Sequence, residues 1–199
     1  MRIFVAGASG LIGVRLVPLL VEAGHEVAGM TRSPDKTGRL RDLGAEPVIC
    51  DVFDAGALAE AVEAYGPDCV FHQLTDLPDN VADMASFGAR NDRIRSEGTH
   101  NLLAAAVAAG AEQFIAQSIA WEQSDEARRA VTASHERTVL AAGGVVIRYG
   151  QLWGPGTYYE TTPPVRPRIH LDDAARLSVL ALEAPPGATL IIDDRAVQA

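Results

Sequence analysis

The chain has 199 residues, of which 48% are hydrophobic and 22% are charged, a length that suits one domain. Its 17 Lys and Arg residues against 26 Asp and Glu residues give a formal net charge of −9. Because a negative chain repels phosphate backbones and anionic lipids, this balance disfavours nucleic acids and membrane surfaces as partners. No apolar run approaches the roughly 20 residues that a membrane span needs, and no signal peptide is evident, so we expect a cytoplasmic protein.

Short apolar runs rich in β-branched residues alternate along the chain with segments of helical length and period. Seven of these runs are predicted strands: Arg2–Ala6, Glu26–Met30, Glu46–Cys50, Asp68–His72, Gln113–Ser118, Val145–Tyr149 and Thr189–Asp193. Most are apolar throughout, so both faces of the sheet should be covered. We therefore predict a doubly wound α/β fold of the Rossmann type, with a parallel sheet of about seven strands, in which residues 1–199 form a single domain.

The segments between the predicted strands carry recognisable helix signals. Leucines and valines recur at three- and four-residue intervals from residue 11 to residue 20, and Gly24 ends that helix. Asp54 is the expected cap of the helix that Gly66 stops, and Gly110 ends another. One stretch departs from the alternation: residues 150–168 are rich in Gly, Pro, Thr and Tyr, which predicts a long loop at the edge where a substrate would bind.

The first predicted strand runs directly into a glycine-rich turn, Gly7-Ala8-Ser9-Gly10-Leu11-Ile12-Gly13, that leads into a helix. Glycines permit a tight turn and a close backbone approach, and the start of the helix offers free N–H groups to a pyrophosphate. The turn opens a strand–helix–strand unit, which is the context that dinucleotide binding requires. We expect contacts to the dinucleotide from Gly7, Ser9, Gly10, Leu11 and Ile12.

The ends of the next strands bear on which dinucleotide binds. The second predicted strand is followed by Thr31, Arg32 and Ser33, with no acid before Asp35. Arg32 would therefore meet the 2′-phosphate of NADP, although NAD stays open and the arginine could simply be solvated. After the third strand, Asp51 and Val52 could face the adenine, with helix capping as the alternative for Asp51. After the fourth, we expect the cofactor to be lined by Gln73, Leu74 and Thr75.

Together these residues resemble the extended and atypical short-chain dehydrogenase/reductases, the superfamily of nucleotide-sugar epimerases and dehydratases. The matching motifs follow the family's order over nearly the whole chain: the Gly7–Gly13 turn, Asp51-Val52, Glu97–Leu103, Gln117–Ala120, Arg148–Gly150, Gly154-Pro155-Gly156 and His170–Ala175. The resemblance implies hydride transfer at a carbon that bears a hydroxyl or carbonyl group.

The resemblance also implies a Tyr-x-x-x-Lys pair on the helix after the fifth strand, helped by a serine at that strand's end. Ser118 matches the serine. The helix, expected within residues 124–142, contains neither tyrosine nor lysine, and Lys36 is the only lysine of the chain. Acid–base work would then fall to other groups, with His135 and Tyr149 as candidates. The alternatives are a histidine on the helix surface and a tyrosine that only packs.

Neither the histidines nor the cysteines predict a metal site. His170 and Asp172 precede a helix, and we expect Asp172 to cap it. Cys50 and Cys69 lie at the edges of apolar runs, without disulfide or metal spacing, and are expected to be buried free thiols.

The substrate lobe of the extended family is expected to be largely absent, because only about a dozen residues separate Tyr158 from His170. A shallow pocket would then be formed by residues 150–168, over which Tyr158 and Tyr159 could close, and a partner subunit of a homodimer could complete it. Arg166 and Arg168 could attract an acidic substrate or could face solvent.

Three functions fit the sequence. The first is an NADP-dependent oxidoreductase acting on a small carbonyl or hydroxyl substrate. The second is a non-redox enzyme on the same fold, such as a cyclase, dehydratase or isomerase. The third is a non-catalytic NADP-binding regulatory module.

Overall fold

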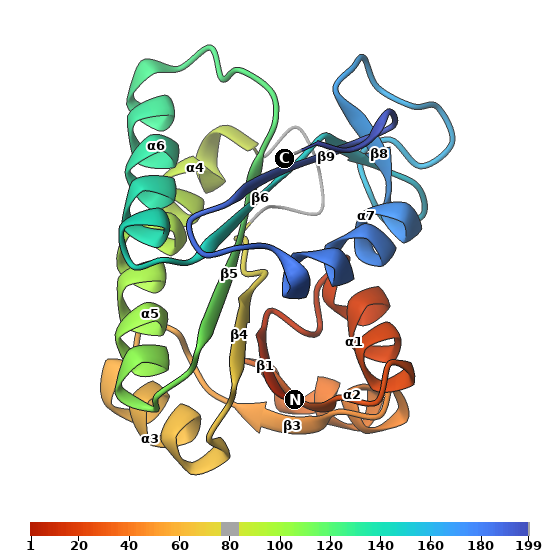
Figure 1. Cartoon of the computed structure of the whole chain (residues 1–199). Helices are drawn as coiled ribbons and strands as arrows, with labels where there is room; N and C mark the ends of the chain where they lie inside the picture. The colour runs from red at the N-terminus through yellow and green to blue at the C-terminus, as the bar shows by residue number, and fades with distance from the viewer. Residues whose placement is uncertain (77–83, 199) are drawn as a thin grey trace.

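A single large sheet forms the centre of the computed structural model, which describes residues 1–76 and 84–198 (Figure 1). Its strands are β1 (Arg2–Ala6), β2 (Glu26–Thr31), β3 (Glu46–Ile49), β4 (Cys69–His72), β5 (Gln113–Ile119), β6 (Val145–Tyr149), β9 (Thr189–Asp193) and β10 (Ala196–Gln198). They lie in the order β10-β9-β6-β5-β4-β1-β2-β3, and every neighbouring pair is parallel except β9 with β10. The predicted doubly wound parallel sheet is confirmed, with β10 as an additional antiparallel edge strand.

Helices cover both faces of the sheet (Figure 1). The first face carries α1 (Gly13–Glu22), α2 (Thr37–Asp42) and α7 (Leu171–Ser178). The opposite face carries α3 (Ala55–Tyr65), α5 (Thr99–Ala108) and α6 (Glu126–Ala141). Each face has its own apolar core, which is why the strands read as continuous apolar runs. No helix in the described part of the chain combines the length and the apolar character that crossing a membrane requires.

Several elements were not predicted, because they have little apolar periodicity. A 3₁₀ turn (Pro34–Lys36) and α2 follow β2, and Leu40 is the only buried residue in the two. The polar helix α4 (Met84–Arg93) continues into a π-helical turn, Ile94–Gly98, before α5. A further 3₁₀ turn, Val179–Glu183, extends α7.

The starts of two helices test the capping predictions. The Asp54 carboxylate accepts the N–H of Ala57 at 3.0 Å and caps α3, as predicted. The prediction that Asp172 caps α7 is wrong. His170 is the cap, since its Nδ1 accepts the N–H of Asp172 at 3.3 Å, and the Asp172 carboxylate accepts instead from Arg15 Nε at 2.8 Å.

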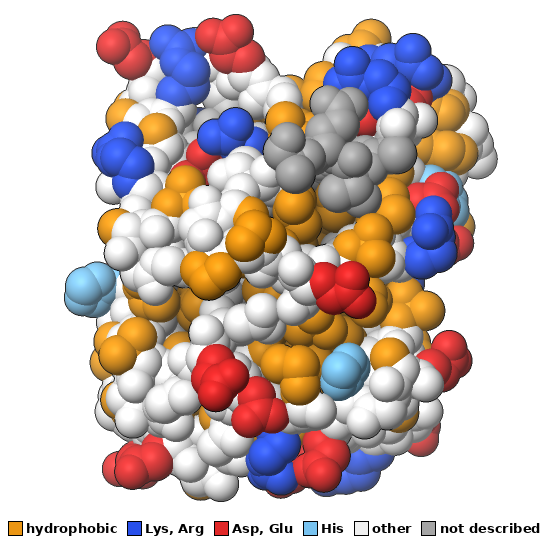
Figure 2. All heavy atoms as spheres, viewed as in Figure 1, with side chains coloured by type: hydrophobic (Ala, Val, Ile, Leu, Met, Phe, Trp, Pro, Cys, Tyr) orange, Lys and Arg blue, Asp and Glu red, His pale blue; other side chains and the backbone are white. Residues whose placement is uncertain are grey.

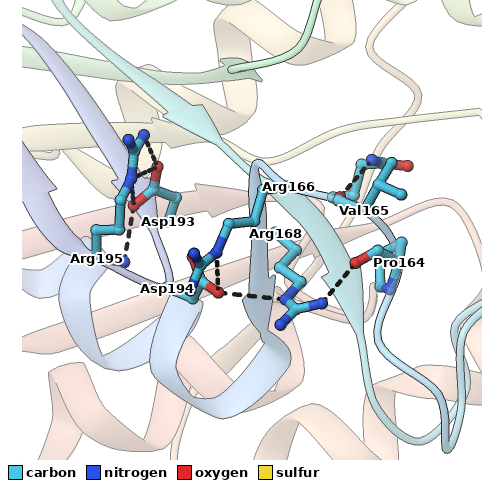
Figure 3. A network of polar contacts seen from close by, with 8 residues as sticks. Pro164, Val165, Arg166, Arg168, Asp193, Asp194 and Arg195 are labelled. Carbon is cyan, nitrogen blue, oxygen red and sulfur yellow. Dashed lines mark hydrogen bonds and ion pairs between the residues drawn. The ribbon is translucent and has the colours of Figure 1, made fainter.

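The stretch 150–168 is more ordered than the predicted loop. It begins with β7 (Gln151–Trp153) and ends in β8 (Arg168–His170), which pair as a parallel two-stranded sheet. Figure 3 shows that Arg166 and Arg168 both turn toward Asp194, with Nε–Oδ2 distances of 2.9 and 3.2 Å. Because both guanidinium groups pair with the same carboxylate, Asp194 compensates about half of their positive charge within the protein.

Candidate cofactor pocket and active site

The glycine turn is held in place by contacts that leave no room for side chains. Gly7 has φ of 91°, and a Cβ there would lie 2.7 Å from the carbonyl oxygen of Gln73. A Cβ at Gly13 would overlap the carbonyl oxygen of Gly7. The Gly10 N–H closes the turn by donating to the Gly7 carbonyl at 3.0 Å. The turn therefore packs directly on the end of β4 and directs the start of α1 to the carboxyl edge of the sheet.

A pocket of about 180 Å³ opens at this edge, beside the ends of β1, β2 and β4. Most of the predicted cofactor residues line it together: Gly7, Ser9, Gly10, Arg32, Val52, Gln73, Leu74 and Thr75. The volume is below the roughly 300 Å³ of a usual ligand pocket, so it would hold only part of an extended dinucleotide. Its position beside the end of β2 indicates the adenosine part.

Three predicted cofactor residues do not line this pocket. Leu11 is 42% exposed and Ile12 is buried in the core. Asp51 is exposed, and its Oδ1 accepts the N–H of Phe53 at 3.0 Å. Asp51 therefore stabilises a turn, and the alternative that it caps the following helix is wrong, because Asp54 is the cap.

Five lining residues were missed by the sequence reasoning: Met30, Thr31, Ser33, Lys36 and Ile94. Met30, Thr31 and Ser33 flank Arg32, so the strand end itself was the signal. Ile94 belongs to the π-helical turn and had no signal. Lys36 follows in the 3₁₀ turn and places a second cation beside Arg32, whose side chain is 48% exposed.

The charges at this end of the pocket fit a phosphate group. No carboxylate is among the lining residues that the structure describes. Among the described residues, the carboxylate that pairs with Arg32 is that of Asp76, at 4.0 Å, and Arg90 binds the same carboxylate oxygen more closely, at 3.0 Å. The Arg32 guanidinium, only loosely paired with Asp76, can also meet an anion in the pocket.

His135 does not lie on the helix surface, which was one interpretation of the sequence. It lies on the inner face of α6 and is 2% exposed. Its Nε2 lies 3.0 Å from the Gln117 carbonyl, and its Nδ1 lies 2.8 Å from Thr99 Oγ1. Thr99 Oγ1 also lies 3.0 Å from His72 Nε2, and His72 Nδ1 accepts the N–H of Leu74 at 3.3 Å. A polar chain therefore runs from α6 to the cofactor pocket.

The hydrogen bonds of this chain assign one proton arrangement. A carbonyl only accepts, so His135 Nε2 carries a proton and donates to Gln117. The Thr99 hydroxyl donates to His135 Nδ1 at 2.8 Å in preference to the Ile94 carbonyl, which lies farther away at 3.3 Å. His72 Nε2–H then donates to Thr99. Both rings are neutral, since burial lowers the pKa of His135 and lowers that of His72 to about 3. Neither ring has a free nitrogen with which to accept a proton from a substrate.

Ser118 is also internal. Its hydroxyl is fully buried and donates to Glu136 Oε1 at 2.6 Å. The same carboxylate accepts from Arg148 Nε at 2.9 Å and from Arg148 Nη2 at 2.5 Å. Burial alone would raise the pKa of Glu136, but the hydrogen bonds from Arg148 and Ser118 hold it below its usual value. The Ser118 hydroxyl thus binds the buried end of an ion pair whose Arg148 end is partly exposed.

Tyr149 lies on the opposite face of the sheet, toward α7, and is 3% exposed. Its hydroxyl accepts from Gln73 Nε2 at 3.1 Å and lies 2.5 Å from Ser178 Oγ. Because the Ser178 hydroxyl donates to the Ala174 carbonyl at 2.6 Å, the phenol donates to Ser178. Burial raises the pKa of Tyr149 to about 12, although both side-chain hydrogen bonds oppose that rise.

The three candidate catalytic residues are therefore not brought together. Ser118 and His135 lie under α6, and Tyr149 lies under α7. Each uses its hydrogen-bonding groups inside the protein. Two of them support the pocket instead, since Tyr149 binds the side chain of Gln73 and the His135 chain reaches the N–H of Leu74.

Figure 2 shows the described surface hollowed at the top of the view, between the β5–α6 connection and residues 154–167. Residues 154–167 come close to the glycine turn, because a Cβ at Gly156 would lie 3.1 Å from Leu11 Cδ2. A substrate could therefore reach the cofactor edge through this hollow.

No metal site is found among the described residues, where no group of three or more His, Cys, Asp or Glu side chains converges. Cys50 and Cys69 are buried free thiols, as predicted. Burial raises the pKa of both thiols, so neither is an activated nucleophile.

Comparison with known proteins agrees with this geometry. Residues 7–143 match the family described as NAD(P)H-binding. A "3-diazoavenalumate denitrifying reductase" from a Streptomyces species is 32% identical, over 98% of this chain and 76% of that protein. A quinoline-oxide ketoreductase from Stigmatella aurantiaca is 29% identical, over 77% of this chain and 51% of its own length.

Solved structures agree on the fold. A UDP-glucose 4-epimerase from Thermotoga maritima superposes with a TM-score of 0.79 at 20% identity, covering 100% of this chain and 78% of that one. A dTDP-glucose 4,6-dehydratase from Streptomyces venezuelae gives 0.74 at 22% identity, over 96% of this chain and 75% of that one. This protein therefore belongs to the NAD(P)H-binding family, among relatives that include reductases and on the fold of the nucleotide-sugar epimerases and dehydratases.

Proposed function

We propose that the protein is an NADPH-dependent reductase whose substrate accepts a hydride without needing a proton from a tyrosine. One observation carries the proposal. The helix after β5 has no Tyr-x-x-x-Lys pair, and Ser118, His135 and Tyr149 are all committed to internal hydrogen bonds. We assign these three residues to positioning and not to proton transfer.

The choice of NADPH over NADH follows from the end of β2. Arg32 and Lys36 line the pocket where a 2′-phosphate would lie, and no carboxylate among the described lining residues is available for a ribose 2′-hydroxyl. Gly7, Ser9 and Gly10 would hold the pyrophosphate beside the start of α1. When bound, the reduced nicotinamide supplies a hydride.

The proton balance separates the possible substrates. Reducing a carbonyl to an alcohol consumes one hydride and one proton, so an enzyme gains from a positioned acid. An aryl diazonium ion that takes a hydride on its terminal nitrogen forms a diazene, which breaks its C–N bond and leaves as arene and N2. That conversion consumes no net proton, and its positive charge is removed by the hydride. A site without the tyrosine acid suits the second substrate class.

The reductase from Streptomyces supports this choice, because its name describes a diazo substrate and the removal of nitrogen. It matches nearly the whole of this chain. We therefore propose an aromatic diazo or diazonium compound as the substrate class, with the hollow between the β5–α6 connection and residues 154–167 as its place of entry.

The test follows NADPH oxidation at 340 nm with three kinds of acceptor: an aryl diazonium salt, an aromatic aldehyde and an aliphatic ketone. NADPH and NADH are compared throughout, and gas release is measured in parallel. We expect oxidation of NADPH with the diazonium salt and equimolar N2, with little turnover of either carbonyl. Gly7→Ala is the control, because its Cβ would meet the carbonyl of Gln73 and close the turn to cofactor.

Three results would contradict the proposal. Rapid reduction of the aldehyde with no reaction of the diazonium salt would show that another group donates the proton. Tight binding of NADPH without oxidation by any acceptor would favour a regulatory module, and turnover of a substrate without any nicotinamide would favour a non-redox enzyme.

A further inference from the structure

A second hollow lies on the outer helices, apart from the cofactor pocket. It runs between α6 and the π-helical turn that leads into α5, and has a volume of about 490 Å³, within the range of small-molecule sites. Its polar lining is basic or carries hydroxyls, from Arg95, His100, Arg137, Ser96, Ser134 and Thr138, and the buried ring of His135 reaches its floor. Within the described part of the chain, no carboxylate lines it.

Arg95 is the unusual residue of this groove. It is 5% exposed, yet no carboxylate of a described residue pairs with it. Its Nη1 donates to Thr132 Oγ1 at 2.6 Å, and its Nε is buried with no hydrogen-bond partner among those residues. Glu136, a nearby carboxylate, is already taken up by Arg148 and Ser118.

Such an arrangement is costly for the free protein. Arginine is almost never buried unless it is paired, and an unpartnered buried donor loses its hydration without compensation. Burial accordingly lowers the pKa of Arg95. Asp92 and Glu136 act on Arg95 only from a distance, whereas a planar or tetrahedral oxyanion in the groove would pair directly with its guanidinium.

We propose that this groove binds the phosphate or carboxylate group of a small molecule on Arg95, with Arg137 and His100 adding positive charge at its rim. The site is separate from the cofactor pocket but adjoins it through the chain. Ile94, the residue before Arg95, lines the cofactor pocket, so consecutive residues of one π-helical turn face the two sites. π-Helical turns of this kind recur at functional sites.

The experiment measures anion binding to the whole chain by calorimetry and by thermal unfolding. The probes are inorganic phosphate and succinate, each compared with chloride at equal ionic strength. Arg95→Met removes the charge and keeps most of the volume. Arg41→Gln, on the exposed surface of α2, is the matched loss of one charge, and Arg32→Gln disables the cation of the cofactor pocket.

We expect phosphate or succinate to bind the wild type, Arg41→Gln and Arg32→Gln alike. Arg95→Met should weaken that binding roughly 10- to 100-fold, the loss expected for charge-assisted hydrogen bonds. Binding of phosphate alone would identify a phosphorylated ligand, and binding of succinate alone a carboxylic acid. Without either anion, Arg95→Met should melt at the same temperature as the wild type or higher, because it removes an unpaired buried charge.

The proposal is overturned if neither anion binds the wild type, or if Arg95→Met binds as tightly as Arg41→Gln does. It is also overturned if Arg32→Gln abolishes binding, since the anion would then occupy the cofactor pocket. A wild-type dimer that Arg95→Met converts to monomers in sedimentation would equally contradict it, because Arg95 would then meet a second copy of the chain.

Discussion

Replacing Thr99 by valine tests the polar chain that links α6 to the cofactor pocket. The Thr99 hydroxyl is 1% exposed, accepts from His72 Nε2 at 3.0 Å and donates to His135 Nδ1 at 2.8 Å. Valine has nearly the same shape but leaves both ring nitrogens buried without partners. Each unsatisfied group costs about 1–3 kcal/mol, and the added methyl recovers about 0.8 kcal/mol. For the two ring nitrogens together, we expect the free energy of unfolding to fall by about 1–5 kcal/mol.

Thr99→Ser is the matched control, because it keeps the hydroxyl and loses only a methyl group, a cost of about 1 kcal/mol. Urea denaturation followed by circular dichroism gives the free energies of all three proteins. Because the chain ends on the N–H of Leu74, Thr99→Val should also weaken NADPH binding more than Thr99→Ser does. If the valine variant is as stable as the serine variant, the hydroxyl does not join the two histidines and the proton arrangement derived above is refuted.

Four further predictions follow from the same contacts. Between pH 6.5 and pH 5 the unfolded chain binds more protons than the folded one at His72 and His135. As the pH is lowered, the free energy of unfolding should therefore decrease by up to about 1.4 kcal/mol per pH unit for each histidine. Denaturation of His135→Gln should show a smaller dependence on pH, and an equal dependence would contradict the burial of His135 as a neutral ring. Arg32→Gln should weaken NADPH about tenfold in a fluorescence titration and leave NADH unchanged, whereas equal losses for both would remove the case for a 2′-phosphate contact. Tyr149→Phe should lower the free energy of unfolding by about 1 kcal/mol and change kcat less than fivefold. A hundredfold loss of kcat would indicate that Tyr149 takes part in the reaction. Glu136→Gln should destabilise the protein by about 1–2 kcal/mol, because Ser118 and the partly exposed Arg148 lose a shared carboxylate; a melting curve like that of the wild type would contradict the role of this carboxylate.

The sheet was predictable because strands that are buried on both faces appear in the sequence as continuous apolar runs. All seven predicted strands occur within two residues of their expected bounds, and the glycine turn lies where β1 meets α1. The antiparallel β10 and the pair β7 and β8 are each only three residues long, too short to show periodicity. The helix α2 buries a single leucine and gave no signal for the same reason.

The interior position of His135 was harder to see, because α6 buries polar side chains. Its inward residues are Thr132, His135, Glu136 and Val139, which recur at the helical period although only one is apolar. A periodicity search restricted to hydrophobic residues misses such a face, since the polar groups are compensated by partners on other elements. The partners Thr99 and Arg148 lie far away in the sequence, so only the folded chain shows that these side chains are satisfied inside.

The cofactor pocket was predictable because its residues follow strand ends, where the topology brings them together. The active site was not, because its family signature is missing and the remaining polar residues serve the interior. Tyr149 and Ser118 sit on neighbouring strands, yet their side chains point to opposite faces of the sheet. Their nearness in the sheet therefore did not imply a shared site.

The central claim is that the substrate takes a hydride without a proton from the protein. The most direct test measures kcat for an aryl diazonium salt between pH 5.5 and pH 7.5 together with the N2 released per NADPH oxidised. We expect one N2 per NADPH and a kcat that does not vary with pH, since no acid on the protein titrates in the reaction. A kcat that falls steadily as the pH rises would contradict the claim, because it would reveal a proton donor that the reaction requires.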